Sequence, residues 1–211
     1  MIIVVGGIKG GSGKTTIATN LAVMRSASKK VLLVDADEQK SAWDWSQQRD
    51  GLVGDSLRSS FSAVCMSGKA ICSNLLRLEE DYSDIIVDTG GRDTTSQRSA
   101  LCVADKLLLP FRPSSIDIWT LVPIKGILIE CVNPNLKVYA VISQADPTGK
   151  DNQDAKGILK EFPDIQTIES TVGNRKAFRN AAADGLGVIE MPFPDKKACQ
   201  EMQSLYDLIY S

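Results

Sequence analysis

One glycine-rich stretch, KGGSGKTT at residues 9–16, constrains the fold of this chain more than any other part of it. An apolar run at residues 2–5 precedes it, so the pattern predicts a buried strand, a loop and then a helix. The glycines let successive backbone N–H groups turn inward around an anion, and the helix N-terminus adds its positive dipole end. Lys14 can reach the outer phosphates of such an anion, and the Thr15 hydroxyl can ligate Mg²⁺. The residues predicted to contact phosphate are Gly10, Gly11, Ser12, Gly13, Lys14, Thr15 and Thr16.

Two acidic segments follow other apolar runs and are predicted to complete the same site. Residues 31–34 (VLLV) lead into DADEQ at residues 35–39, and a later apolar run ends at Asp88. The carboxyl ends of parallel strands are where α/β sheets bind ligands, so these carboxylates are expected beside the loop. Asp88 would hold Mg²⁺ through water, because this cation gives up its hydration shell reluctantly. Gly90 and Gly91 then form a loop that is free to rearrange when a phosphate arrives or leaves.

Composition limits the chemistry that the chain can perform. Of its 211 residues, 43% are apolar and 24% are charged, as in soluble globular domains. The net charge of −2 means that any nucleic-acid binding needs a local basic patch. Histidine is absent, which leaves carboxylates, lysines, hydroxyls and a bound cation to carry the chemistry. Five cysteines without a C-x-x-C pair, and no secretory signal, favour a reducing, cytoplasmic location.

The order of the apolar segments predicts the fold. Strand-like runs alternate with helical patterns along the whole chain, which favours one α/β domain over residues 1–211 with a doubly wound, mostly parallel sheet flanked by helices. The expected strands are residues 2–7, 31–34, 61–66, 84–88, 106–111, 137–143 and 165–168. The expected helices are residues 14–28, 39–49, 69–80, 94–104, 115–131 (irregular at Pro123) and 152–161, with a last helix at the C-terminus.

The loop sequence resembles that of a known family. It has Ile8 where the general phosphate-loop pattern has glycine, and a second lysine, Lys9, ahead of the glycines. The form K-G-G-x-G-K-T-T resembles the deviant Walker A motif of the ParA/MinD P-loop ATPases, and residues 84–91 resemble their Walker B strand. The DADEQ segment matches their D-x-D-P-Q except for Glu38 in place of proline.

The resemblance implies ATP/ADP and Mg²⁺ as ligands and gives the site residues their roles. Lys9 would cross a nucleotide-sandwich dimer to the partner's ATP. Asp37 would position the attacking water and help to hold the magnesium shell. The implied catalytic residues are Lys9, Lys14 and Asp37, and the implied Mg²⁺ ligands are Thr15, Asp37 and Asp88.

Segments in the second half of the chain resemble the same family. Residues 110–117 (PFRPSSID) are similar to a segment of small plasmid-partition ATPases that shapes the dimer face beside the nucleotide. By family position, Gln144 and the loop with Pro194 and Asp195 would lie on the adenine side.

A basic cluster is the candidate DNA surface. Residues 173–190 resemble a family block whose basic residues contribute to sequence-independent DNA binding. Arg175, Lys176 and Arg179 are at helical spacing, so two or three of them could share one face. An ordinary charged, solvated helix face is the alternative interpretation.

Taken together, the resemblance implies a small ParA-type DNA-segregation ATPase without an N-terminal DNA-binding domain. Such a protein forms a homodimer on ATP binding, binds nonspecific DNA of the nucleoid, and hydrolyses ATP slowly unless a centromere-binding, ParB-like partner stimulates it. A MinD-like membrane-associated positioning ATPase is one alternative. It would need a basic amphipathic C-terminal helix, whereas the apolar positions of the last helix here suit packing on the core, so no stable membrane association is expected. A ParA-like ATPase that positions a protein cargo is the other alternative.

Overall fold

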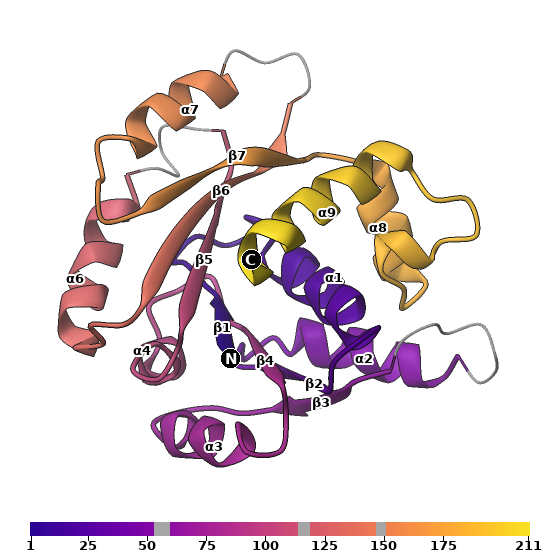
Figure 1. Cartoon of the computed structure of the whole chain (residues 1–211), viewed down its shortest axis with the longest axis horizontal. Coiled ribbons are helices and arrows are strands. Elements are labelled where there is room, and N and C mark those ends of the chain that lie inside the picture. The colour runs from indigo at the N-terminus through magenta and orange to yellow at the C-terminus, as the bar shows by residue number, and fades with distance from the viewer. Residues whose placement is uncertain (53–59, 114–118, 147–150) are drawn as a thin grey trace.

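The computed structural model describes residues 1–52, 60–113, 119–146 and 151–211. Within them the chain forms a sheet of seven strands in the order β3-β2-β4-β1-β5-β6-β7, and every neighbouring pair is parallel (Figure 1). The strands are β1 (Ile2–Val5), β2 (Val31–Asp35), β3 (Ser62–Cys65), β4 (Asp84–Asp88), β5 (Lys106–Phe111), β6 (Lys137–Ala145) and β7 (Gln166–Gly173). The helices are α1 (Lys14–Ser26), α2 (Ser41–Asp50), α3 (Ala70–Leu78), α4 (Thr95–Leu101), α6 (Leu121–Cys131), α7 (Asp151–Leu159), α8 (Lys176–Ala183), the 3₁₀ helix η1 (Val188–Glu190) and α9 (Lys196–Tyr210). The predicted doubly wound, mostly parallel α/β fold is thus confirmed.

The sheet divides the protein into two cores because successive strand side chains point to opposite faces. In β1, Ile2 and Val4 pack with α3, α4, α6 and α7, whereas Ile3 and Val5 pack with α1, α2, α8 and α9. Figure 1 shows these two groups of helices on either side of the sheet. All four β1 residues are fully buried. Burial on both faces explains why the central strands are continuous apolar runs rather than alternating ones.

Two elements differ from the sequence-based boundaries by more than three residues. Helix α6 begins at Leu121, so Pro123 lies in its first turn, where a missing N–H removes no intrahelical bond. The expected start of that helix at residues 115–118 lies outside the described residues. Residues 114–117 of the predicted dimer-face segment (residues 110–117) lie outside them too. Strand β7 extends to Gly173 rather than ending at residue 168. It is an edge strand in which only three of the eight residues are buried, so its polar residues gave no apolar signal.

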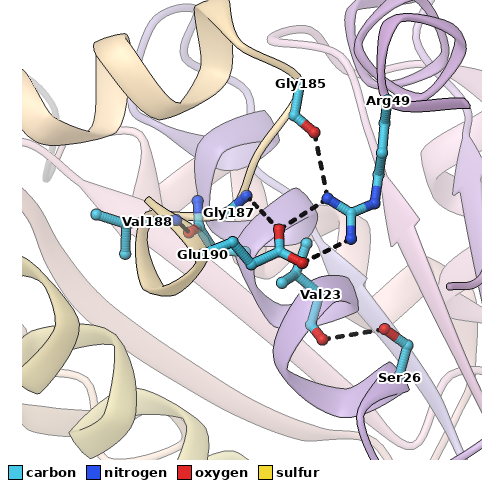
Figure 2. A network of polar contacts seen from close by, with 8 residues as sticks. Val23, Ser26, Arg49, Gly185, Gly187, Val188 and Glu190 are labelled. Atoms are coloured by element: carbon cyan, nitrogen blue, oxygen red, sulfur yellow. Dashed lines mark hydrogen bonds and ion pairs between the residues drawn. The ribbon is translucent and has the colours of Figure 1, made fainter. Parts of the chain in front are cut away.

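A buried ion pair holds α2 against η1. The Arg49 guanidinium donates to both carboxylate oxygens of Glu190 at 2.7 Å, and also to the Gly185 carbonyl at 3.2 Å (Figure 2). Glu190 in turn accepts the Gly187 N–H at 2.9 Å. Both charged side chains are only 4% exposed. Because α2 follows the loop that carries Asp37, this pair fixes the far end of the helix into which that loop leads.

We expect the substitution Glu190→Gln to lower the free energy of unfolding by about 3 kcal/mol, because it leaves a buried guanidinium without its counter-charge. Urea denaturation monitored by circular dichroism measures the change. The matched control is Asp164→Asn, which removes a carboxylate from an exposed pair with Lys125 (3.3 Å) and is expected to cost under about 1 kcal/mol. Equal losses of unfolding free energy in the two variants would show that the buried Arg49–Glu190 pair contributes no more to stability than an exposed pair.

Candidate functional site

A cavity of about 580 Å³ opens at the carboxyl ends of the central strands. The glycine-rich loop forms one wall of it, and the segments that follow β2 and β4, with Gln144 near the end of β6, form the rest. Its lining residues are Gly10, Gly11, Ser12, Gly13, Lys14, Thr15, Thr16, Asp37, Glu38, Gln39, Ser41, Thr89, Gly90, Gly91, Arg92, Thr94 and Gln144. Every residue predicted to contact phosphate therefore faces one cavity, together with Asp37, which is predicted to position the attacking water.

Parallel pairing brings the two acidic segments together. Strand β4 pairs with both β1 and β2, so Asp88 lies opposite Val5 on one side and opposite Asp35 on the other. The loop between β1 and α1 begins directly after Val5. Thr15, in the first turn of α1, donates its hydroxyl to Asp88 Oδ2 at 2.7 Å. Loop and carboxylates thus meet because their strands are neighbours in the sheet, as expected for this class of fold.

Asp88 has the environment of a cation ligand. It is fully buried, and its Oδ1 has no hydrogen-bond partner among the described residues. Burial raises the pKa of Asp88 to about 7, against the opposing effect of the Thr15 hydrogen bond. A buried carboxylate oxygen without a partner is costly, and a cation beside it removes that cost. Thr15 and Asp88 therefore fit Mg²⁺, which needs few protein ligands when water and phosphate supply the others.

Lys14 is held inside the loop that it follows. Its side chain is buried, and its Nζ donates to the Lys9 carbonyl at 2.8 Å. Burial lowers the pKa of Lys14, whereas the nearby Asp88 and Asp37 oppose the shift. The ammonium group is thus prepositioned between the loop backbone and the two acidic segments. The backbone of Lys9 forms part of this arrangement, while the predicted role of its side chain in a dimer stays a prediction.

Asp35 makes more contacts to the backbone of the loop after β2 than the Asp37 carboxylate does, which accepts the Gln39 N–H at 3.2 Å. Asp35 accepts the backbone N–H groups of Asp37 at 2.9 Å and of Trp43 at 2.8 Å, which ties the loop to the start of α2. Burial raises the pKa of Asp35 despite these hydrogen bonds. The Asp37 carboxylate is left to face the cavity, so close to Gly90 that a Cβ there would come within 2.9 Å of Asp37 Oδ1. This placement suits the predicted role of Asp37, which remains a prediction.

Three residues at the site were missed by the sequence analysis or were placed differently by it. Gln97 of α4 accepts the Gly7 N–H at 3.0 Å and the Thr89 hydroxyl at 2.9 Å, which links the helix after β4 to the phosphate loop. Arg112 and Gln144 both donate to the carbonyl of Gly11. No local motif predicts these contacts with the phosphate loop, because Gln97, Arg112 and Gln144 are all far from the loop in the sequence.

The remaining predicted site residues lie outside the cavity lining. Asp195 caps α9 by accepting the N–H of Lys197 at 2.9 Å, and neither it nor Pro194 faces the cavity. Their adenine-side role is therefore untested. In the basic cluster, Arg175 precedes α8 and is paired with Glu201, through a 2.6 Å contact among others, whereas Lys176 and Arg179 are exposed on α8. Only the last two present an exposed basic surface.

Comparison with known proteins also supports a nucleotide-binding role for this chain. A model of the CobQ/CobB/MinD/ParA nucleotide binding domain matches residues 3–188. The chain belongs to this family. Its match covers the phosphate loop and both acidic segments, so the cavity lies within the matched nucleotide binding domain.

Individual relatives include proteins that position different cargoes. The chain is 31% identical over 189 residues to "Maintenance of carboxysome distribution protein A" of Gloeobacter kilaueensis, covering 86% of this chain and 81% of that protein. Its fold matches a variant McdA from Cyanothece in complex with ATP, with a TM-score of 0.81, 19% identity and coverage of 99% and 96%. It also matches a plasmid partition protein of Borrelia burgdorferi bound to AMPPNP, with a TM-score of 0.76, 18% identity and coverage of 99% and 98%. At these identities the two structures establish the fold.

Proposed function

We propose that this chain is a ParA-type positioning ATPase that works as a nucleotide-gated dimer. ATP and Mg²⁺ join two copies, the dimer binds DNA without sequence preference, and hydrolysis stimulated by a partner protein releases it. The observation that carries this proposal is the convergence of Lys14, the Thr15–Asp88 pair and Asp37 on one cavity. These are the groups that phosphoryl transfer needs, because its catalysis is chiefly positioning and charge neutralisation.

Each residue has a defined task in this scheme. The loop N–H groups and Lys14 bind the phosphates, and Asp37 orients the water for in-line attack on the outermost one. Thr15 and Asp88 would hold Mg²⁺, which supplies charge neutralisation on the phosphate oxygens when bound. Lys9 completes the partner's phosphate site. A partner protein that orders the site could accelerate hydrolysis, as supplied cations do by ~10³–10⁵ in related enzymes.

Dimerisation gives the direct test of the scheme. With ATP and Mg²⁺, light scattering should report about twice the 22.8 kDa mass of the single chain, and with ADP it should report the single chain. A protein that stays monomeric with a slowly hydrolysed ATP analogue would contradict the gated dimer.

The cargo has two candidates. A plasmid or chromosome, bound through a centromere-binding ParB-like partner, suits the resemblance to small partition ATPases and the fold shared with the Borrelia protein. A protein assembly suits the 31% identity to the carboxysome-distribution protein. Stimulation of ATP hydrolysis by candidate partners discriminates them: a centromere-DNA-binding partner supports the first, and a partner that binds a protein compartment supports the second.

The MinD-like alternative receives less support from α9. Four apolar side chains of this helix, Ala198, Met202, Leu205 and Ile209, are fully buried against the sheet and α1, and Leu208 is partly buried beside them. They are therefore not available to enter a lipid surface, as a membrane-binding amphipathic helix requires. Among the described residues no helix is both long and apolar enough to cross a bilayer. Sedimentation with anionic liposomes and ATP tests this alternative.

Nonspecific DNA binding is expected to depend on α8. In the double substitution Lys176→Ala/Arg179→Ala, two exposed cations are lost, and the slope of log K against log salt should fall by up to about 1.8. Fluorescence anisotropy of a labelled duplex with ATP measures the slope. The control Lys125→Ala/Lys160→Ala removes two lysines from the opposite helix layer and should leave the slope unchanged. If the control variant shows the larger drop, the DNA surface lies on the other face.

A further inference from the structure

A carbonyl group of the phosphate loop makes an unusual contact. Three N–H groups from two side chains converge on the carbonyl oxygen of Gly11. Arg112, directly after β5, donates through Nε at 2.9 Å and through a second nitrogen, and Gln144, near the end of β6, donates through Nε2 at 2.6 Å. These residues are 101 and 133 positions away from Gly11 in the chain. Two separate strands thus place donors on one loop carbonyl.

The local geometry around Gly11 is adapted to this contact. The φ angle of Gly11 is +70°, and a Cβ there would lie 2.6 Å from the Arg112 guanidinium. Gln144 itself has a φ of +54°, a conformation that residues other than glycine adopt at a cost. Backbone strain of this kind persists where surrounding contacts over-determine it, and it is concentrated at functional sites. The strain at Gln144 coincides with its hydrogen bond to the loop.

We propose that Arg112 and Gln144 are positioning residues that lock the Gly11–Ser12 peptide in the orientation needed to bind phosphate. In a trans peptide the carbonyl of one residue and the N–H of the next point in opposite directions. With the Gly11 carbonyl held by Arg112 and Gln144, the Ser12 N–H is directed away from these donors. Ser12 is buried and lines the cavity, so this N–H becomes one of the donors to the anion. If the peptide flipped, it would present an oxygen to the phosphate instead.

This assignment gives Gln144 a task other than contact with adenine. It also gives a role at the phosphate loop to Arg112, which the resemblance places only within the segment at residues 110–117 that shapes the dimer face beside the nucleotide. The proposal rests on nucleotide binding by this cavity alone, and it stands whether or not the chain dimerises, binds DNA or positions a cargo.

The test uses the full chain and two probes, Mg²⁺–ATP and Mg²⁺–tripolyphosphate, which has the phosphates without the base. In the double substitution Arg112→Ala/Gln144→Ala, affinity for both probes should fall by the same factor, roughly 10-fold or more, because one oriented donor to a charged group is lost. Each single substitution should have a smaller effect. The control Arg77→Ala, which removes an exposed cation from α3, should retain wild-type affinity for both.

A spectroscopic signal separates positioning from general damage to the fold. In ¹⁵N-labelled wild-type protein, tripolyphosphate should shift the Ser12 amide resonance, and in the double variant that shift should be lost while resonances of the sheet stay in place. Arg112→Lys, which keeps the charge but loses the planar pair of donors, should recover only part of the affinity. A loss of affinity for ATP with none for tripolyphosphate would overturn the proposal and assign Gln144 to the base. An unchanged Ser12 shift in a folded double variant would also overturn it.

Discussion

The substitution Lys14→Ala is expected to weaken ATP binding by roughly 100-fold or more, because it removes a buried cation that no neighbouring side chain can replace. Lys14 is only 6% exposed, and its Nζ lies on the Lys9 carbonyl at 2.8 Å, inside the loop that surrounds the phosphates. Its loss would also remove a positive charge that interacts with Asp88 and Asp37. Equilibrium titration with a fluorescent ATP analogue and Mg²⁺ measures the effect.

Lys9→Ala is the matched control, because it removes the other lysine of the same loop. Only the backbone carbonyl of Lys9 holds Lys14, and alanine retains that carbonyl. We therefore expect Lys9→Ala to bind ATP as a monomer with near-wild-type affinity and to fail at dimerisation. Thermal melting of both variants shows whether they are folded. Wild-type ATP affinity in a folded Lys14→Ala variant would overturn the assignment of the loop.

The parts of the fold that could be predicted are those in which local pattern and tertiary environment agree. The β1 and β4 strands are buried on both faces, so their apolar runs mark them without ambiguity. In contrast, β7 continues through the polar residues Glu169, Ser170 and Thr171, because an edge strand with partly exposed faces does not need apolar side chains. Its length is decided by pairing with β6, which the local sequence does not reveal.

The residues of the site also divide into those that could be predicted from the sequence and those that could not. Lys14, Thr15 and Asp88 could be predicted because short motifs bring their functional groups to strand ends, and parallel pairing then brings those ends together. The contacts of Arg112 and Gln144 with the loop could not be predicted, since each residue reaches Gly11 from a segment more than a hundred residues away. Arg175 shows another limit of the sequence. The resemblance implies a DNA contact there, which stays a prediction, and the spacing does not reveal that Glu201, from α9, pairs with Arg175.

The substitution Asp37→Ala should separate ATP binding from hydrolysis. Loss of a residue that orients the attacking water is expected to lower the rate of hydrolysis by about 10²-fold or more. The phosphate contacts of Lys14 and the loop remain, so ATP affinity should change little. The loop itself should keep its path, because Asp35 holds it through the backbone N–H of residue 37, which alanine retains. Because release depends on hydrolysis, the variant should accumulate as an ATP-bound dimer.

Two measurements on the same samples decide whether Asp37 has this role. Phosphate release gives the hydrolysis rate, and light scattering after removal of free ATP gives the lifetime of the dimer, which should lengthen in proportion to the loss in rate. Glu38→Ala is the matched control: it removes the adjacent acidic side chain, and an unaltered rate is expected because no catalytic role falls to Glu38. If Asp37→Ala hydrolyses ATP at the wild-type rate, another group orients the water. If it instead fails to bind ATP, the main contribution of Asp37 is to hold the nucleotide and its cation, and the dimer lifetime will shorten rather than lengthen.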